Sequence, residues 1–118
     1  MKYKTLNTIL YCKQWEDTVR FYKEVLKLEV CFSNAWFVEF CLNDGARLSV
    51  ANEKSATIQS NQGKGITLGF EVEDIQSMLT AVRGFDIPAS PIKELWGAQV
   101  FYIHDPEETR IEFWSPVR

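Results

Sequence analysis

The stretch LNTILYCKQWEDTVRFYKEVLKL, residues 6–28, changes its periodicity partway along. Leu6 to Cys12 is apolar and includes Thr and Tyr, a composition typical of a strand. Beyond it, apolar residues recur with the period of one helix face, at Trp15, Val19, Tyr22 and Leu26. The stretch therefore predicts a strand followed by an amphipathic helix.

Strand patterns complete the first half of the chain. Residues 28–32 have strand-like composition, and residues 36–42 alternate, with Trp36, Val38, Phe40 and Leu42 on one face. Asn43-Asp44-Gly45 is a strong hairpin signal, and residues 46–51 form the returning strand. The first half is thus predicted to be a βαβββ unit.

The second half repeats this order. Strands are predicted over residues 66–72, 99–104 and 110–114, and Pro88 and Pro91 indicate irregular chain between them. Asp74 is the expected N-cap of a helix with an apolar stripe, and Gly84 occupies the expected C-terminal cap.

Weak internal similarity links the two halves. Asn7 aligns with Thr67, Phe40 with Phe101, and residues 47–50 with residues 110–113. We expect a single domain over residues 1–118, made of βαβββ modules at about residues 5–51 and 65–116, with residues 52–64 as the linker.

Composition excludes several classes of protein. The 118 residues have a net charge of −3 and no basic run, which argues against nucleic-acid binding. No apolar run approaches the ~20 residues of a membrane span, and no signal-peptide pattern is present, so we expect a cytoplasmic protein. Cys12, Cys31 and Cys41 lack metal-binding spacing and are predicted to be buried, reduced thiols.

Segments in both halves resemble known signatures. Residues 19–28 (VRFYKEVLKL) resemble a first-helix signature in which Lys27 replaces the usual Gly, and residues 70–74 (FEVED) resemble the entry to a second helix. Residues 96–114 resemble a closing hairpin of the WG…F…DP type, with residues 107–109 (EET) in place of DGN. These signatures are those of the vicinal-oxygen-chelate superfamily, which includes glyoxalase I, bleomycin-resistance proteins and extradiol dioxygenases.

The resemblance spans about residues 6–116 and implies an α+β fold. Two tandem βαβββ modules would form a curled, cup-shaped mixed sheet, often in a homodimer. Catalytic members hold a divalent metal in the cup, and the alignment places the four ligand positions at Asn7, Ser49, Thr67 and Glu112.

Of these residues only Glu112 is a strong ligand, because neutral hydroxyls seldom anchor a transition metal and catalytic sites usually need three good ligands. We therefore expect no metal and no other cofactor, as in the metal-free bleomycin-resistance-like branch. The single histidine, His104, is expected at a strand end beside the Asp105-Pro106 turn, away from these positions.

Strand alternation predicts which side chains line the cup. The expected ligand-binding residues are Tyr11, Phe37, Glu39, Arg47, Glu71, Tyr102, Arg110, Glu112 and Trp114. The alternative is an ordinary sheet face on which Glu39 pairs with Arg47, and Glu112 with Arg110, across strands.

The expected function is binding of a small organic molecule in the cup without a catalytic metal. One alternative is a lyase, isomerase or dioxygenase of the same superfamily, acting on a small molecule; without a metal, Glu112 or Glu71 would be its base. Loss of the metal-ligand positions argues against an enzyme. A second alternative is an interaction domain with a vestigial cup. Because the inward acids Glu39, Glu71 and Glu112 outnumber Arg47 and Arg110, we expect a flat or aromatic, cationic ligand.

Overall fold

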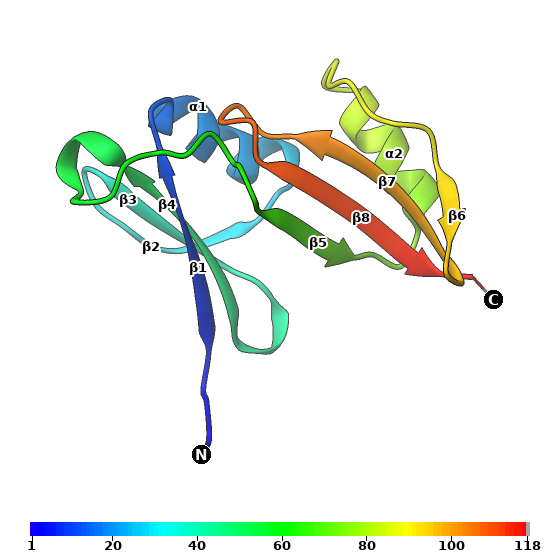
Figure 1. Ribbon diagram of the computed structural model, residues 1–118, viewed down its shortest axis with the longest axis horizontal. Helices are drawn as coiled ribbons and strands as arrows, with labels where there is room; N and C mark the ends of the chain where they lie inside the picture. The colour runs from blue at the N-terminus through cyan, green and yellow to red at the C-terminus, as the bar shows by residue number, and fades with distance from the viewer. Residues whose placement is uncertain (118) are drawn as a thin grey trace. The chain divides into compact units, whose positions relative to one another are not determined.

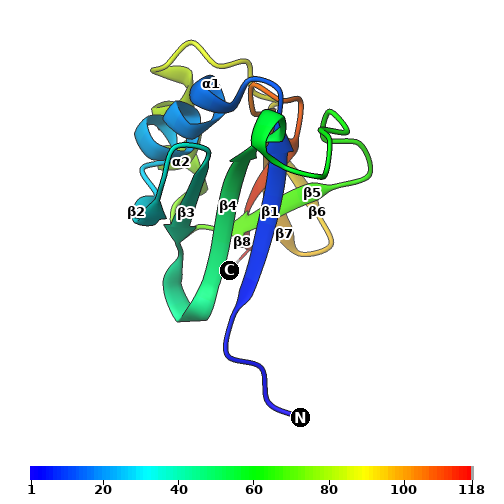
Figure 2. The same ribbon diagram turned by 90° about the vertical axis from the view of Figure 1, so that its left-hand side faces the viewer.

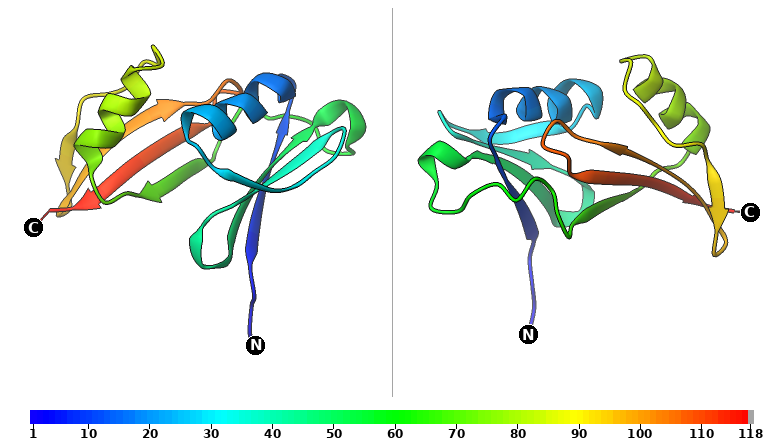
Figure 3. Two further views of the ribbon diagram at one scale, coloured as in Figure 1. Left: turned by 180° about the vertical axis from the view of Figure 1, so that it is seen from behind. Right: turned by 45° about the horizontal axis from the view of Figure 1, so that its top comes forward.

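Each half of the chain folds into a four-stranded mixed sheet with a helix against one face, and neither sheet closes into a barrel (Figures 1 and 3). The structure, a computed structural model, describes residues 1–117 and all of their side chains except that of Asp44. It divides into two compact units, unit 1 from Met1 to Gln62 and unit 2 from Gly63 onward. Within residues 1–117, no helix has both the length and the apolar character needed to cross a membrane.

Unit 1 has the strand order β1-β4-β3-β2 (Figure 2). Its elements are β1 (Leu6–Cys12), α1 (Trp15–Arg20), a π-helical turn (Phe21–Val25), β2 (Glu29–Ser33), β3 (Phe37–Cys41), a 3-10 turn (Asn43–Gly45), β4 (Ala46–Asn52) and a second 3-10 turn (Glu53–Ser55). The first and last strands, β1 and β4, pair in parallel, and the other pairs are antiparallel.

Unit 2 repeats this topology with the strand order β5-β8-β7-β6. Its elements are β5 (Thr67–Glu71), α2 (Ile75–Arg83), β6 (Lys93–Leu95), β7 (Ala98–His104) and β8 (Arg110–Pro116). Again the first and last strands are parallel neighbours. The short strand β6 lies where Pro88 and Pro91 indicated irregular chain, so its position was not anticipated.

The pairing register of the strands shows which residues of the two units correspond. Asn7 pairs with Arg47 in unit 1, and Thr67 pairs with Arg110 in unit 2, so the alignment of these residues is confirmed. Phe40, however, pairs with Leu48, whose counterpart Ile111 pairs with Ile103. The expected match of Phe40 with Phe101 is therefore wrong by two positions, which leaves strand parity unchanged.

The helix-facing side of each sheet forms the core of its unit. In unit 1 the fully buried side chains on this side include Cys12, Phe40 and Val50, and Trp15 of α1 donates its indole N–H to the Val50 carbonyl at 2.8 Å. In unit 2, Ile75, Leu79 and Val82 of α2 are buried together with Phe101, Ile103, Ile111 and Phe113 of the sheet. Complete burial of such a side chain contributes about 1.5–3 kcal/mol, so this packing fixes which sheet face meets the helix.

Two of the cysteines depart from expectation. Cys31 of β2 is exposed, Cys41 of β3 is half-buried, and the two form a disulfide with Cα atoms 5.8 Å apart. Cys12 alone is buried, and its thiol donates to the Leu10 carbonyl at 3.6 Å. The prediction of three buried thiols failed because β2 is an edge strand on which every residue is exposed.

The acidic turn between β7 and β8 is held by its own first residue. The buried carboxylate of Asp105 accepts hydrogen bonds from the backbone N–H groups of Glu107 and Thr109, at 2.8 and 2.9 Å. The chain at Gly63 passes so close that an added Cβ would lie 2.5 Å from the Thr109 Cα. Gly63 also has φ +71, so both space and backbone conformation require glycine there.

Helix α2 begins at the predicted N-cap. The Asp74 carboxylate accepts from the Ser77 backbone N–H at 3.1 Å and from the Ser77 hydroxyl at 2.7 Å. At the other end Gly84 is the C-cap but has φ −63, and the left-handed residue is Asp86, with φ 58. The helix thus ends near the expected glycine without using its conformational freedom.

We predict that Asp74→Ala destabilises the protein at pH 7 and destabilises it less at pH 3. Hydrogen bonds from the Ser77 hydroxyl and backbone N–H hold the pKa of Asp74 below its ordinary value of 3.8. A carboxyl group whose folded-state pKa is lowered stabilises the fold above the unfolded pKa, and this stability is lost as the pH falls through the folded-state pKa. Urea denaturation followed by circular dichroism measures the difference. The exposed neighbour Glu73→Ala is the control, and an equal loss at both pH values for Asp74→Ala would contradict the prediction.

Candidate functional site

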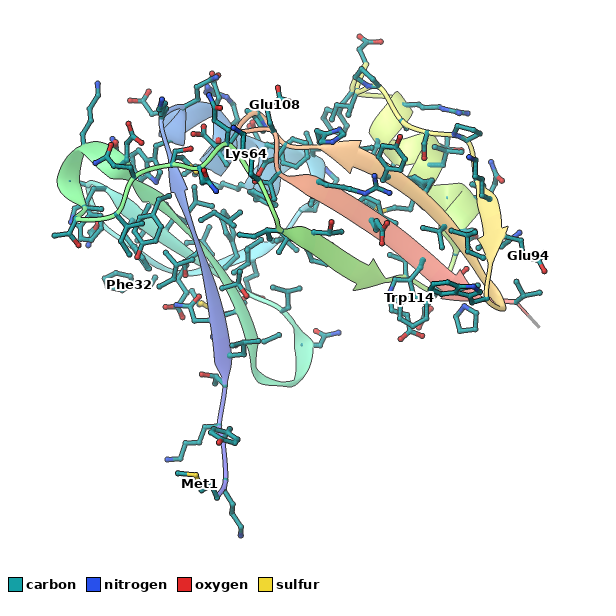
Figure 4. All side chains as sticks on the ribbon, in the orientation of Figure 1. Met1, Phe32, Lys64, Glu94, Glu108 and Trp114 are labelled. Carbon is teal, nitrogen blue, oxygen red and sulfur yellow. A yellow bond between two sulfur atoms is a disulfide. The ribbon has the colours of Figure 1, made fainter. Side chains whose placement is uncertain are left out.

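Each sheet has a second face that no helix of its own unit covers, which we call the helix-free face. In unit 2 the register places β5, β7 and β8 side chains together there: Thr67, Gly69, Glu71, Val100, Tyr102, His104, Arg110, Glu112 and Trp114. Figure 4 shows Trp114 on the side of the sheet away from α2. All five site residues expected in the second module, namely Glu71, Tyr102, Arg110, Glu112 and Trp114, lie on this face.

Arg110 contacts two neighbours at one end of the unit 2 face, where it pairs with Thr67 and His104. Its guanidinium carbon lies 3.8 Å from the centre of the Tyr102 ring, and its Nη2 donates to Glu112 Oε1 at 3.0 Å. Arg110 and Glu112 stand on the same strand, β8, so the pair forms along a strand rather than across strands as expected. A guanidinium held by a ring on one side and a carboxylate on the other keeps one orientation and presents a flat surface.

His104 lies on the same face, although it was not among the expected ligand-binding residues. It is the last residue of β7, as expected, but its register partner is Arg110, and its ring meets Tyr102 edge-on with ring centres 5.8 Å apart. Strand parity would have found it, because His104 follows Val100 and Tyr102 at every second position of β7. His104 was expected away from the four aligned positions, and the register places it on the same sheet face as two of them, Thr67 and Glu112.

Glu71 and Trp114 form the other end of the unit 2 face. They are register partners on β5 and β8, with Glu71 exposed and Trp114 half-buried. Among the described residues Glu71 makes no ion pair. An indole ring beside a carboxylate suits a positively charged group, because the ring face and the carboxylate both attract it.

The helix-free face of unit 1 carries the four remaining expected residues, Tyr11, Phe37, Glu39 and Arg47. Tyr11 and Phe37 flank Ala51 on neighbouring strands, and Arg47 Nε lies 3.4 Å from Glu39 Oε2. The cross-strand pairing of these two charges agrees with the alternative interpretation. Phe32 of β2 extends this aromatic surface, with its ring centre 6.4 Å from that of Phe37, and Figure 4 shows it projecting from the sheet.

The aligned metal positions do not fit a divalent metal. The hydroxyl of Ser49, which is fully buried, donates to Asn7 Oδ1 at 2.8 Å and so engages the one oxygen that Asn7 could offer. Glu112 is paired with the guanidinium of Arg110, and Thr67 provides only a hydroxyl. Within residues 1–117 no group of three or more His, Cys, Asp or Glu side chains is arranged to hold a metal ion. No chemical step through a metal follows from these residues.

Clefts of pocket size lie elsewhere, beside the start of each helix. A cleft of about 510 Å³ in unit 2 is lined by residues 73–76, Gln99 and residues 115–117, and one of about 250 Å³ in unit 1 is lined by residues 13–17, Asn52 and Lys54. Their linings consist largely of polar side chains and carry none of the expected site residues. Binding pockets for organic molecules are mostly apolar with a few fixed polar groups, a description that suits the helix-free faces better.

Two four-stranded sheets, each with parallel first and last strands and one helix, define the class of proteins built from paired βαβββ modules. Residues 5–118 match the glyoxalase-like domain family, and the chain belongs to that family. The resemblance to the vicinal-oxygen-chelate superfamily and the expected α+β fold are thereby confirmed. A comparison with curated proteins gives no match.

Similar solved structures cover both modules. Lactoylglutathione lyase from Agrobacterium tumefaciens has TM-score 0.79 and 20% identity, over 98% of this chain and 95% of that chain. A glyoxalase/bleomycin resistance protein/dioxygenase from Nocardioides has TM-score 0.80 and 18% identity, over 100% and 85%. TnmS3, an antibiotic binding protein from a Streptomyces species, has TM-score 0.79 and 11% identity, over 98% and 97%. At these identities the similarity establishes the fold alone.

We predict that the purified protein holds no stoichiometric Zn, Ni, Fe or Mn. The reason is the donor set, in which a hydroxyl engages Asn7 and a guanidinium engages Glu112. Elemental analysis after incubation with each metal and gel filtration measures the content. One equivalent of metal per chain, lost in Glu112→Ala and kept in the exposed-turn control Glu108→Ala, would contradict the prediction.

Proposed function

We propose that the chain binds a small, flat organic molecule on the helix-free faces of its sheets and uses no catalytic metal to do so. The observation that carries this proposal is the stack of Arg110 on Tyr102, with Glu112 holding the guanidinium. Trp114 lies on the same face, two positions along β8 from Glu112. Rings and guanidinium are already in place before any ligand arrives, which lowers the entropic cost of binding.

The ligand is proposed to carry a positive charge. Arg47 and Arg110 are both within ion-pair distance of a carboxylate, at 3.4 and 3.0 Å, so neither is the open anion site that would reverse this preference. Glu39 and Glu112 are occupied by the same pairs, so of the three expected acids only Glu71 is left to attract a cation. We therefore assign the cation to the space beside Glu71 and over the Trp114 ring, where a cation–π contact contributes about 0.5–2 kcal/mol.

The names of similar solved structures support small-molecule binding but do not establish the function of this chain. An antibiotic binding protein shares the fold, and so does a lyase, so the fold serves both kinds of function. The donor set at the aligned metal positions favours the expected binding function over the alternative of a metal-dependent enzyme. We further propose that the chain works as a homodimer in the cytoplasm, as members of the superfamily often assemble in pairs.

The test of this proposal is a binding panel of planar dyes matched in size. Proflavine, a planar cation, is expected to raise the melting temperature more than neutral acridone or an anthraquinone sulfonate. Glu71→Gln is expected to weaken proflavine binding by roughly two- to fivefold, the equivalent of a partly exposed charge contact. Trp114→Leu should weaken all planar ligands, because the ring contact is lost for each of them.

The control variant is Glu73→Gln, which removes the same charge two residues further along, beyond the end of β5. It should leave proflavine affinity unchanged. Binding of the sulfonate alone, abolished by Arg110→Ala, would reverse the assigned charge. A panel without any binder would favour the interaction-domain alternative.

A further inference from the structure

We propose that the Cys31–Cys41 disulfide is a thiol–disulfide exchange site, at which a small thiol forms a mixed disulfide with Cys31. This inference is independent of the proposed ligand. It rests on the difference in exposure between the two cysteines and on the charged residues that neighbour them. Exchange requires that a thiolate reach one sulfur and that the other sulfur leave as a thiolate.

Cys31 is the accessible sulfur. It lies on the edge strand β2, all of whose residues are exposed, at the point where the β2–β3 register shifts. Cys41 lies on the inner strand β3 and is half-buried. A nucleophile from solvent therefore meets Cys31 first.

Charge next to the two sulfurs favours departure of Cys41. Cys41 is the register partner of Arg47 across β3 and β4, and cross-strand partners on one face have Cβ atoms about 4.5–5.5 Å apart. The Arg47 side chain, whose guanidinium also pairs with Glu39 at 3.4 Å, therefore starts beside Cys41, and its positive charge favours a thiolate there. Cys31 Sγ instead lies 3.4 Å from the Glu39 carboxylate oxygen Oε2, which opposes a thiolate at Cys31.

Complete reduction of the disulfide takes two thiol–disulfide exchange steps. The first thiolate bonds to Cys31 Sγ as the Cys31–Cys41 bond breaks, and Cys41 leaves as a thiolate that takes a proton from water. A second thiolate bonds to the small-thiol sulfur of the mixed disulfide and releases Cys31. Two small thiols are oxidised to their disulfide while the protein disulfide is reduced to two thiols, so electrons and atoms are conserved.

The simplest alternative is a structural disulfide that anchors the edge strand β2 to β3. Such a bond would resist small thiols until the strand itself unfolds. An exchange site reacts in the folded state. The two cases differ in whether reduction and unfolding occur together.

The experiment equilibrates the folded, full-length chain with a cysteine/cystine buffer of varied ratio. Acid quenching, alkylation and peptide mass spectrometry then identify the state of each cysteine, while circular dichroism follows the fold. We expect Cys31 and Cys41 to become alkylatable together as the fraction of cysteine rises, with the fold retained. We also expect a cysteine adduct on Cys31 in samples quenched early, and none on buried Cys12, which is the internal control.

Variants test the roles of Cys41 and of the neighbouring charges. In Cys41→Ser the adduct on Cys31 should accumulate, because no second protein thiol displaces it. Arg47→Ala should slow opening of the disulfide by roughly threefold or more, since the leaving thiolate loses its cation, and Glu39→Gln should not slow it. Both sets of measurements use the folded wild-type chain as reference.

Three results would overturn the inference. The first is that both thiols remain alkylatable in pure cystine buffer. The second is a disulfide that opens only together with loss of the circular dichroism signal, as a purely structural bridge would. The third is an adduct on Cys41 in place of Cys31.

Discussion

The parallel pairing of the first and last strands of each unit is the constraint on which the rest of the structure depends. Side chains alternate along a strand, so the register of β1 on β4 and of β5 on β8 decides which residues face the helix. Burial of Phe40 and Val50 in unit 1, and of Phe113 and Ile111 in unit 2, holds that register. A slip by one residue would move these side chains into solvent and bury charged ones.

The same register gives the two units equivalent positions with different chemistry. Arg47 and Arg110 are counterparts, yet one contacts a carboxylate across the strand pair and the other stacks on a tyrosine. Ser49 and Glu112 are counterparts as well, and each is engaged by a neighbour on its own sheet. These local pairs engage the side chains of Asn7, Ser49 and Glu112, three of the four aligned metal positions.

Much of the fold could be predicted from the sequence because its signals are local. Periodicity located both helices and most strands, and the Asp74 cap fixed where α2 begins. Parity correctly assigned Glu39, Tyr102 and Trp114 to one side of their sheets. The short strand β6 was missed although it forms a local hairpin with β7, because its three residues, Lys93–Leu95, are too few to show an alternating pattern.

Side-chain contacts within the candidate site were harder to predict from the sequence than the sheet face on which each residue lies. The disulfide depends on a register shift in β2 that brings Cys31 to Cys41, and no sequence spacing reveals such a shift. The place of His104 follows from strand parity, because it lies two residues after Tyr102 on β7, and the adjoining turn gives no sign of it. The partners of Arg110 depend on its rotamer, which brings the guanidinium against both Tyr102 and Glu112 only once the sheet has formed.

The most direct test of strand parity is a nuclear Overhauser spectrum of the labelled protein, centred on the Tyr102 ring. The account predicts cross-peaks from the Tyr102 ring protons to the side chain of Arg110, because the guanidinium lies 3.8 Å from the ring centre. It predicts none to Leu79 of α2, which packs on the opposite face. Cross-peaks from Tyr102 to Leu79, without any to Arg110, would show that β7 presents its other face and would contradict the assignment of the helix-free face.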